Sequence, residues 1–113
     1  MMKVYLVSSQ AAEGRVYKIG HTGREVRDRI RDLSTGNSSP MVVESFFSSR
    51  WARKIESVLH RHFRTRRVSG EWFDLGPEQV AEFLVLCQRT HDALEMLDDK
   101  NTYVADRGGV GKI

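Results

Sequence analysis

The hydrophobic positions in the first half of the chain change from a strand period to a helical period and back. β-Branched and aromatic residues fill two short runs, 3–8 and 15–20, and the stretch between them ends in a turn glycine. This pattern predicts an antiparallel hairpin. Apolar residues then recur at helical spacing over about 24–34, which predicts an amphipathic helix. A third strand is expected at 41–47, entered through Pro40.

The second half of the chain has a helical pattern that is interrupted once. Five apolar residues predict a helix over about 49–66: Ala52, Ile55, Val58, Leu59 and Phe63. A turn and a short strand-like run at 71–75 follow. Pro77 then occupies a typical first-turn position of a third helix, over about 77–97. The polar segment 98–113 is expected to form a flexible tail.

Taken together, these elements predict a small α/β sandwich in which helices flank a three-stranded, largely antiparallel sheet. The 113 residues suffice for one domain with a modest core. We place that domain at 1–97, with its motif core at 3–75 and its C-terminal helix at about 77–97. The sequence contains no internal repeat.

Hydropathy and the single cysteine indicate the cellular compartment in which the protein is expected. No apolar run approaches the length of a membrane span, and the N-terminal apolar stretch is too short for a signal peptide. The single cysteine, Cys87, cannot form an internal disulfide. It lies in an apolar helical pattern, which favours a buried, inert thiol. We therefore expect an intracellular, cytoplasmic protein that has no membrane partner.

Charge is distributed unevenly along the chain. Residues 15–67 contain 13 Lys and Arg against 5 Asp and Glu, whereas the rest of the chain contains 5 against 10. A concentrated basic segment suggests a polyanionic partner such as nucleic acid. On charge alone, a solvated basic helix surface is an equally good explanation.

Two charged residues at the borders of predicted helix faces suggest phosphodiester chemistry, which needs a base, positive charge near the phosphorane and usually a cation. Helical spacing places Glu56 beside Ile55 at the edge of the buried face. Since Mg²⁺ often needs only one or two protein carboxylates, Glu56 is the candidate metal ligand. Arg29 flanks its own apolar stripe and could direct its guanidinium at a phosphate. An ordinary surface glutamate and a surface arginine are the alternatives.

Two tyrosines and a lysine lie in the predicted hairpin. Tyr5 and Tyr17 are mid-strand, where packed aromatic residues are common. Strand alternation puts Lys18 on the face opposite Tyr17. If Lys18 and Tyr5 share a face, the ammonium group would lower the pKa of the phenol and help it to act as a base. A solvent-exposed lysine beside a packed tyrosine is the alternative.

The histidines give weaker indications. His60 follows Glu56 by one helical turn and could support it, whereas His62 falls in the apolar stripe and is expected to be a hydrogen-bonded core residue. No set of histidines, cysteines and carboxylates has the spacing of a zinc site. Glu71 is a weaker candidate for a second metal ligand.

In combination, these residues resemble the GIY-YIG nuclease superfamily, and in particular its phage-type branch with a KIG core. The resemblance covers about residues 3–75. The matching positions are the motif tyrosine Tyr5, the Lys18-Ile19-Gly20 core, the helix arginine Arg29, the stretch Leu33, Thr35, Gly36 and Asn37, the metal-binding glutamate Glu56, and the Gly-Glu-Trp-Phe signature at 70–73. Lys18 stands where most of the family has tyrosine, and the asparagine often found after the glutamate helix is absent.

The resemblance implies a metal-dependent endonuclease that cuts or nicks DNA. The implied site roles are Tyr5 as general base or water-orienting group, Lys18 beside the nucleophile, Arg29 on the scissile phosphate, Glu56 binding Mg²⁺ or Mn²⁺, and His60 in support. Basic residues predicted to contact nucleic acid are Arg24, Arg27, Arg53, Arg66 and Arg67. RNA is an alternative substrate, and a homodimer or a separate partner could supply specificity. The alternative function is a nucleic-acid-binding module on the same fold with weak or no catalysis.

Overall fold

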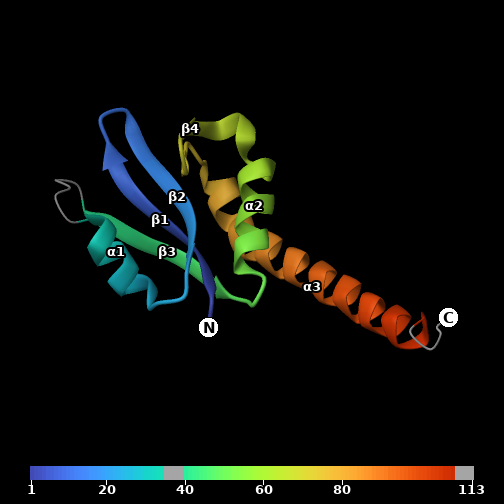
Figure 1. The fold of residues 1–113 in the computed structure, drawn as a ribbon. Coiled ribbons are helices and arrows are strands. Elements are labelled where there is room, and N and C mark those ends of the chain that lie inside the picture. Colours follow the sequence, from blue (N-terminus) through green and yellow to red (C-terminus); the bar gives the residue numbers. More distant parts are fainter. Residues whose placement is uncertain (35–39, 109–113) are drawn as a thin grey trace.

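The computed structural model describes residues 1–34 and 40–108 and forms a sheet with helices on both faces (Figure 1). The elements in chain order are β1 (Lys3–Ala11), β2 (Gly14–Thr22), α1 (Val26–Ser34), β3 (Met41–Ser48), α2 (Ala52–His62), the 3₁₀ turn η1 (Arg64–Arg66), β4 (Arg67–Ser69), β5 (Trp72–Phe73) and α3 (Pro77–Gly108). The predicted hairpin, third strand and three helices are all present. The stretch predicted at Thr35, Gly36 and Asn37 lies outside the described residues.

The sheet has five antiparallel strands in the order β3-β1-β2-β5-β4. The predicted α/β class with an antiparallel sheet flanked by helices is confirmed. The prediction of three strands was wrong, because β5 pairs with β2 through Tyr17 and Lys18, and β4 adds to β5. The short strand predicted at 71–75 is present as β5, although it was not counted in the sheet, whereas the three-residue β4 is too short to show an alternating pattern.

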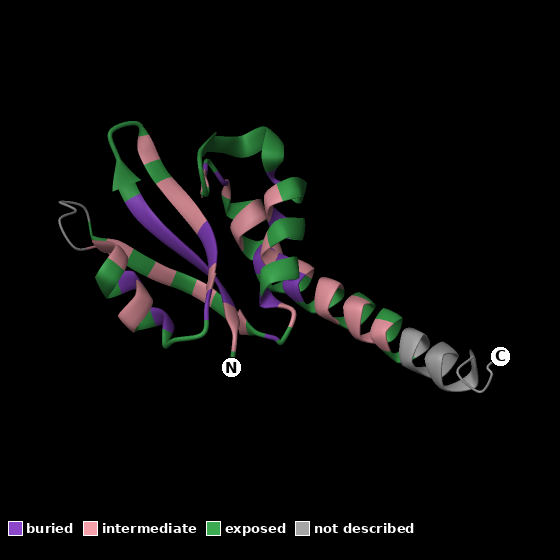
Figure 2. Cartoon of the chain, in the orientation of Figure 1, coloured by how far each residue is buried: buried purple, intermediate pink, exposed green. Residues whose placement is uncertain are grey.

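Side chains of the central strand β1 alternate between two cores. Val4 and Leu6 belong to the larger cluster, formed with α2 and α3, whereas Tyr5 and Val7 belong to a smaller cluster with Val26 of α1. This follows from the two-residue period of a strand that is covered on both faces. Figure 2 shows the buried residues gathered along this strand and the helix faces toward it.

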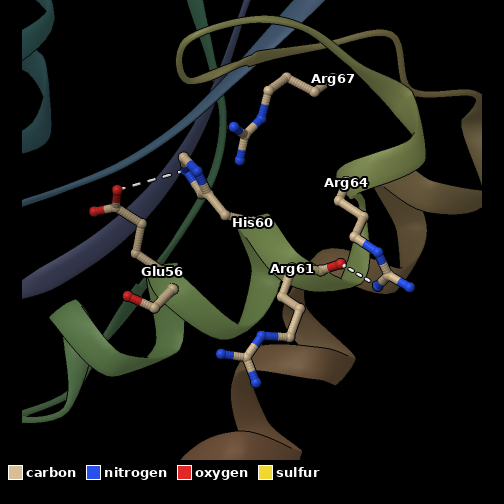
Figure 3. Close-up of a pocket in the computed structure, with 6 residues that line it drawn as sticks. Glu56, His60, Arg61, Arg64 and Arg67 are labelled. Atoms are coloured by element: carbon tan, nitrogen blue, oxygen red, sulfur yellow. Dashed lines mark hydrogen bonds and ion pairs between the residues drawn. The ribbon is translucent and has the colours of Figure 1, made fainter.

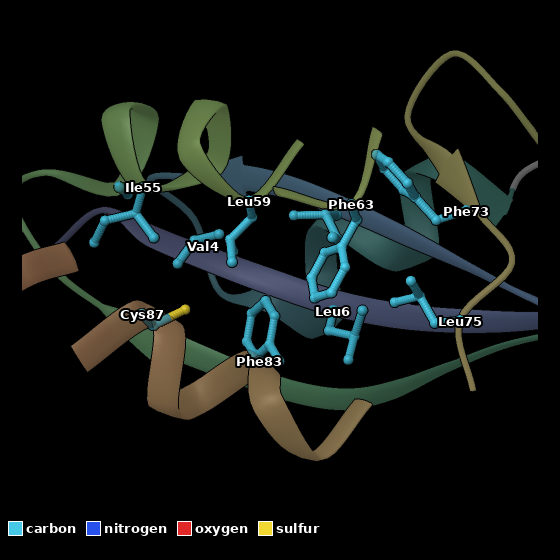
Figure 4. Close-up of a cluster of buried hydrophobic side chains, with 11 residues drawn as sticks. Val4, Leu6, Ile55, Leu59, Phe63, Phe73, Leu75, Phe83 and Cys87 are labelled. Carbon is cyan, nitrogen blue, oxygen red and sulfur yellow. The ribbon is translucent and has the colours of Figure 1, made fainter. Parts of the chain in front are cut away.

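The larger core joins α2 and α3 to the sheet. Ile55 and Leu59 of α2 and Phe83 and Cys87 of α3 are all 0–1% exposed and pack around β1 (Figure 4). The expectation of a buried thiol is therefore confirmed, and burial raises the pKa of Cys87 to about 12. Val58, predicted to lie in the apolar stripe, is 42% exposed. It falls one position off the row that faces the sheet.

The C-terminal ends of two helices differ from the prediction, and α2 also starts later, at Ala52. The helix predicted at 49–66 is α2, which ends at His62 and continues as the 3₁₀ turn. The helix predicted at 77–97 is α3, which continues to Gly108, so the part of the expected flexible tail at 98–108 is helical. Residues 109–113 of that segment lie outside the described residues. The polar composition after Leu97 suggested a tail because it lacks an apolar stripe, yet it contains no proline to end a helix.

An ion-pair network fixes the start of α2 against the middle of α3. Arg50 donates from Nε and Nη2 to the Glu95 carboxylate at 2.8 and 3.0 Å and from Nη2 to Asp98 at 2.9 Å. The indole N–H of Trp51 also donates to Glu95, at 2.8 Å. Beyond this network α3 extends away from the sandwich (Figure 1).

Candidate functional site

Glu56 lies on the border of the buried face of α2, as its position beside Ile55 predicted. Ile55 is fully buried, whereas the Glu56 side chain is 15% exposed. One carboxylate oxygen, Oε1, contacts Nδ1 of His21, and the other, Oε2, is 3.5 Å from Nε2 of His60. A carboxylate has about four lone-pair sites, so both histidine contacts leave acceptor capacity toward solvent.

His60 is held in one orientation by a hydrogen bond and a ring contact. Its Nε2 donates to the backbone carbonyl of Ile19 at 2.9 Å, so that nitrogen carries a proton. Its ring meets Phe73 edge-on with centroids 5.0 Å apart. The predicted proximity of His60 to Glu56 is therefore found, and the histidine connects the glutamate helix to strand β2.

His21 is a site residue that the sequence analysis missed. It pairs with Val4 in the β1–β2 register, and Val4 faces α2, so His21 points to the same side and reaches Glu56. Strand alternation from the buried Ile19 would have indicated this face. His62, predicted to be a core residue, is instead 45% exposed, with Glu82 4.0 Å away. The apolar row passes through Leu59 and Phe63 and leaves His62 outside.

Tyr5 lies on the opposite face of the sheet and covers Gly20. The two residues are paired in the register, and the phenol packs directly over the glycine, which has no side chain to displace it. Tyr5 is 1% exposed. A side-chain hydrogen bond joins it to the half-buried Arg29 of α1.

Burial dominates the ionisation of Tyr5. Desolvation raises the pKa of the phenol above its usual value of about 10, and the Arg29 hydrogen bond and charge only partly oppose this. The charges of Glu71 and Glu56 raise the pKa further. Tyr5 is therefore a neutral phenol in the folded protein near neutral pH, able to donate a hydrogen bond.

Lys18 shares the face of Tyr5, since its register partner is Val7, two residues along β1. Its ammonium group pairs with Glu71 at 2.9 Å and lies 5.8 Å from the centre of the Trp72 ring. The expectation that Lys18 lowers the pKa of Tyr5 was wrong. The pKa is raised, and Arg29 supplies the opposing positive charge.

The predicted site has a Glu56 part on one face of the sheet and a Tyr5–Arg29 part on the other, and the two parts approach each other at β2. Gly20 faces Tyr5, and the next residue, His21, faces Glu56. In the described part of the chain, β5 pairs with β2 at Tyr17 and Lys18 alone. The backbone N–H of Ile19 also donates to the carbonyl of Glu71, at 3.3 Å, so within the described residues this edge of β2 is held up to Ile19, just before Gly20 and His21.

An arginine-lined pocket of about 520 Å³ opens beside Glu56. Its lining residues come from α2, η1 and β4 (Figure 3): Glu56, Ser57, His60, Arg61, Arg64 and Arg67. Arg67 extends toward the sheet and Arg61 extends away from it. Three guanidinium groups against one carboxylate make this an electropositive pocket, as a polyanion-binding site requires.

The predicted nucleic-acid contacts occupy different environments. Arg67 lines the pocket, whereas Arg66 is outside this lining and donates to the carbonyl of Asp74 at 3.4 Å. Arg24 forms an ion pair with Asp32, which lowers the pKa of that carboxyl. Arg27 and Arg53 are exposed, on α1 and α2. The pocket arginines Arg61 and Arg64 were not predicted, although they continue the three-residue spacing to Arg67.

The residues present fit a metal held by one carboxylate. Among the described residues, no group of three or more His, Cys, Asp or Glu side chains is placed to hold a metal ion together. Glu56 offers a partly exposed carboxylate with acceptor capacity on the arginine-lined pocket. This suits a hard cation such as Mg²⁺, which keeps most of its waters.

The fold and this pocket define a small α/β domain with an electropositive site built around one carboxylate. Residues 2–88 match the T5orf172 domain family, and the chain belongs to that family. The family is associated with nuclease-like proteins of phages, so the chain is a nuclease-like or DNA-binding domain. Neither a curated protein nor a solved structure matches the chain. Within the described segments, no helix is both long and apolar enough to cross a membrane.

Proposed function

We propose that the chain is a metal-dependent endonuclease of the GIY-YIG type that hydrolyses DNA phosphodiester bonds in the cytoplasm. The observation that carries this proposal is the position of Glu56, a partly exposed carboxylate held by His21 and His60 at the mouth of an electropositive pocket. A protein that only bound DNA would gain nothing from a carboxylate at this position, because it repels phosphate. Membership of a nuclease-associated family supports the same conclusion.

Glu56 would hold Mg²⁺ or Mn²⁺ through the acceptor capacity that its histidine contacts leave. When bound, the cation supplies positive charge for the leaving oxygen of the phosphodiester. His21 and His60 orient the carboxylate, because they approach different oxygens from β2 and from α2 itself. The carbonyl of Ile19 fixes His60 in turn.

Arg29 and Tyr5 would act on the substrate from the other side of β2. Arg29 is half-buried and can exchange its hydrogen bond with Tyr5 for a phosphate oxygen, where a guanidinium fork binds well. The raised pKa of Tyr5 favours the role of orienting the attacking water over that of a phenolate base. Lys18, paired with Glu71, would add positive charge beside the nucleophile.

The second candidate function is a DNA-binding module with weak or no catalysis. Two observations favour it: Tyr5 is 1% exposed, and the Lys18 ammonium is already paired with Glu71. A homodimer or a separate specificity partner would suit either function, since the sequence carries no motif of a separate reader module.

The test is cleavage of supercoiled and branched DNA in Mg²⁺ or Mn²⁺ by the wild type, Glu56→Gln and Glu13→Gln. Glu13 is exposed in the β1–β2 turn and serves as the charge-matched control. We expect Glu56→Gln to lower the cleavage rate by about 100-fold or more while DNA binding and the melting temperature stay near wild type. Chelation of the metal should abolish cleavage and leave binding.

Three results would contradict the proposed site, support the binding module or disqualify the assay. Cleavage that survives in Glu56→Gln contradicts the proposed site. Salt-sensitive binding without cleavage by the wild type supports the binding module. Loss of cleavage in Glu13→Gln to the same extent would show that the assay reports net charge and not the site.

A further inference from the structure

Three arginines follow one another at three-residue intervals across three different elements. Arg61 lies in the last turn of α2, Arg64 in η1, and Arg67 at the start of β4. All three are exposed, and all three line the pocket that also contains Glu56 (Figure 3). The turn from helix to strand thus places three guanidinium groups around the pocket that Glu56 also lines.

We propose that this arginine row binds the phosphates that flank the cleaved bond, so that the DNA backbone runs from Glu56 along η1 to β4. The inference rests on the proposed function, because it takes Glu56 as the position of the scissile phosphate. The pocket would then position one strand through its backbone, without reading its sequence.

The row is free to bind an anion. Among the described residues, none of its three members forms an ion pair with a carboxylate, in contrast to Arg24 and Arg50. Within the row, Arg64 Nη1 donates a hydrogen bond to the backbone carbonyl of Arg61, at 3.0 Å. That contact leaves most donors of the Arg64 guanidinium available.

The carboxylate in the same pocket already has partners. In the described part of the chain, Glu56 is the only carboxylate lining the pocket, and it already contacts two histidines. The Arg67 guanidinium lies 5.8 Å from the centre of the Phe73 ring, which gives it a preferred position over a buried aromatic. A pre-positioned guanidinium loses less entropy when it binds a phosphate.

The row also defines a direction. Arg67 extends toward the sheet and Arg61 extends away from it (Figure 3), so one phosphate cannot satisfy both guanidinium groups equally. Successive phosphates along one DNA strand can each bind one of the two guanidinium groups. On the α1 side of the site, by comparison, Arg24 is engaged by Asp32. We therefore expect the strong backbone contacts on the β4 side of the scissile bond.

The test measures equilibrium binding of a DNA duplex of about 20 base pairs, in chelator, over about 0.05–0.4 M salt. The proteins compared are the wild type, Arg61→Ala, Arg67→Ala, their double variant and Arg89→Ala. Arg89 is exposed on α3 and does not line the pocket. Arg89→Ala therefore removes one positive charge, as each single alanine variant does, without changing the pocket. The variants Arg61→Lys and Arg67→Lys keep the charge.

Each alanine in the row should reduce the slope of log affinity against log salt by about 0.9 and weaken binding about fivefold near physiological salt. The double variant should lose about twice the slope, the same for any duplex sequence. Arg89→Ala should leave the slope unchanged, and the lysine variants should restore it. Equal effects of Arg89→Ala and Arg61→Ala, or an unchanged slope in the double variant, would overturn the inference.

This outcome is separable from that of the cleavage assay. Reduced slopes in a protein that never cuts DNA would uphold backbone binding by the arginine row and reject the nuclease proposal. Normal slopes in a protein whose cleavage of DNA depends on Glu56 would uphold the nuclease proposal and reject the arginine row.

Discussion

Tyr5 packs over Gly20 so closely that a Cβ atom at position 20 would stand 2.6 Å from the ring carbon Cζ and closer still to the hydroxyl oxygen. No side chain fits there without moving the phenol or the strand. The glycine of the Lys18-Ile19-Gly20 core is therefore required by packing, and its backbone φ is not the reason.

Gly20→Ala should destabilise the fold by about 1–3 kcal/mol, the usual cost of overpacking a core. Chemical denaturation measures the change. Gly23→Ala is the control, since the nearest atom to its new Cβ is the flexible Met2 Sδ at 3.2 Å. Equal stability of the two variants would contradict the packing argument.

The ionisation of Tyr5 should be controlled by Arg29. Absorbance titration of the wild type against Tyr5→Phe should isolate a phenol that ionises only above about pH 10. Arg29→Ala removes the group that lowers this pKa, so the Tyr5 step should move to still higher pH. Tyr17→Phe removes a different phenol and should leave the step in place. A Tyr5 step at lower pH in Arg29→Ala would refute the assignment.

The contacts of Arg50 and Trp51 with Glu95, which hold α3 to the start of α2, should weaken in acid as Glu95 becomes protonated. Arg50 and the indole of Trp51 lower the pKa of Glu95 to about 2, below the value of about 4.3 for an unfolded glutamate. A lowered folded-state pKa stabilises the folded protein above about pH 4.3. This contribution is lost as the pH falls toward about 2.

Melting temperatures of wild type and Glu95→Gln should therefore differ at neutral pH and converge as the pH falls through that window. Glu13→Gln, in an exposed turn, provides the comparison for loss of one carboxylate. A difference that persisted unchanged to about pH 2 would show that the ionised form of Glu95 is not what stabilises α3.

The thiol of Cys87 should report global unfolding. It is 0% exposed, and burial raises its pKa to about 12, so the native protein presents almost no thiolate to a reagent near neutral pH. Labelling followed by mass spectrometry should be slow in buffer and rapid in denaturant. Rapid labelling of the native protein would mean that α3 detaches from the sheet on the labelling timescale.

The sequence was sufficient for the fold class because the main strands and helices have strong periods. The alternation at 3–8 and 15–20 predicted the hairpin that became β1 and β2. The run at 71–75 predicted the strand that became β5, but the pairing of β5 with β2 and of β4 with β5 is tertiary, and no local pattern encodes it. The extension of α3 beyond Leu97 was not predicted, because the residues that follow have no apolar stripe.

The candidate site was predictable where helical position decides it. Glu56 lies at the border of the buried face because it follows Ile55. Its partner His21 comes from 35 positions earlier in the chain and required the β1–β2 register to be known. Arg67 was predicted to contact nucleic acid, but Arg61 and Arg64 were missed because the row crosses from helix to strand, where helical spacing no longer applies.

The brief pairing between β5 and β2 has a consequence for the mobility of the molecule. β5 joins the sheet at two residue pairs, and β4 is held to the sheet through β5. Amide hydrogen exchange should therefore be fastest at this edge and slowest in β1, which has a paired strand on each side. Since Arg67 begins β4, a local opening of this edge would carry one end of the arginine row away from Glu56 while the rest of the fold stayed intact.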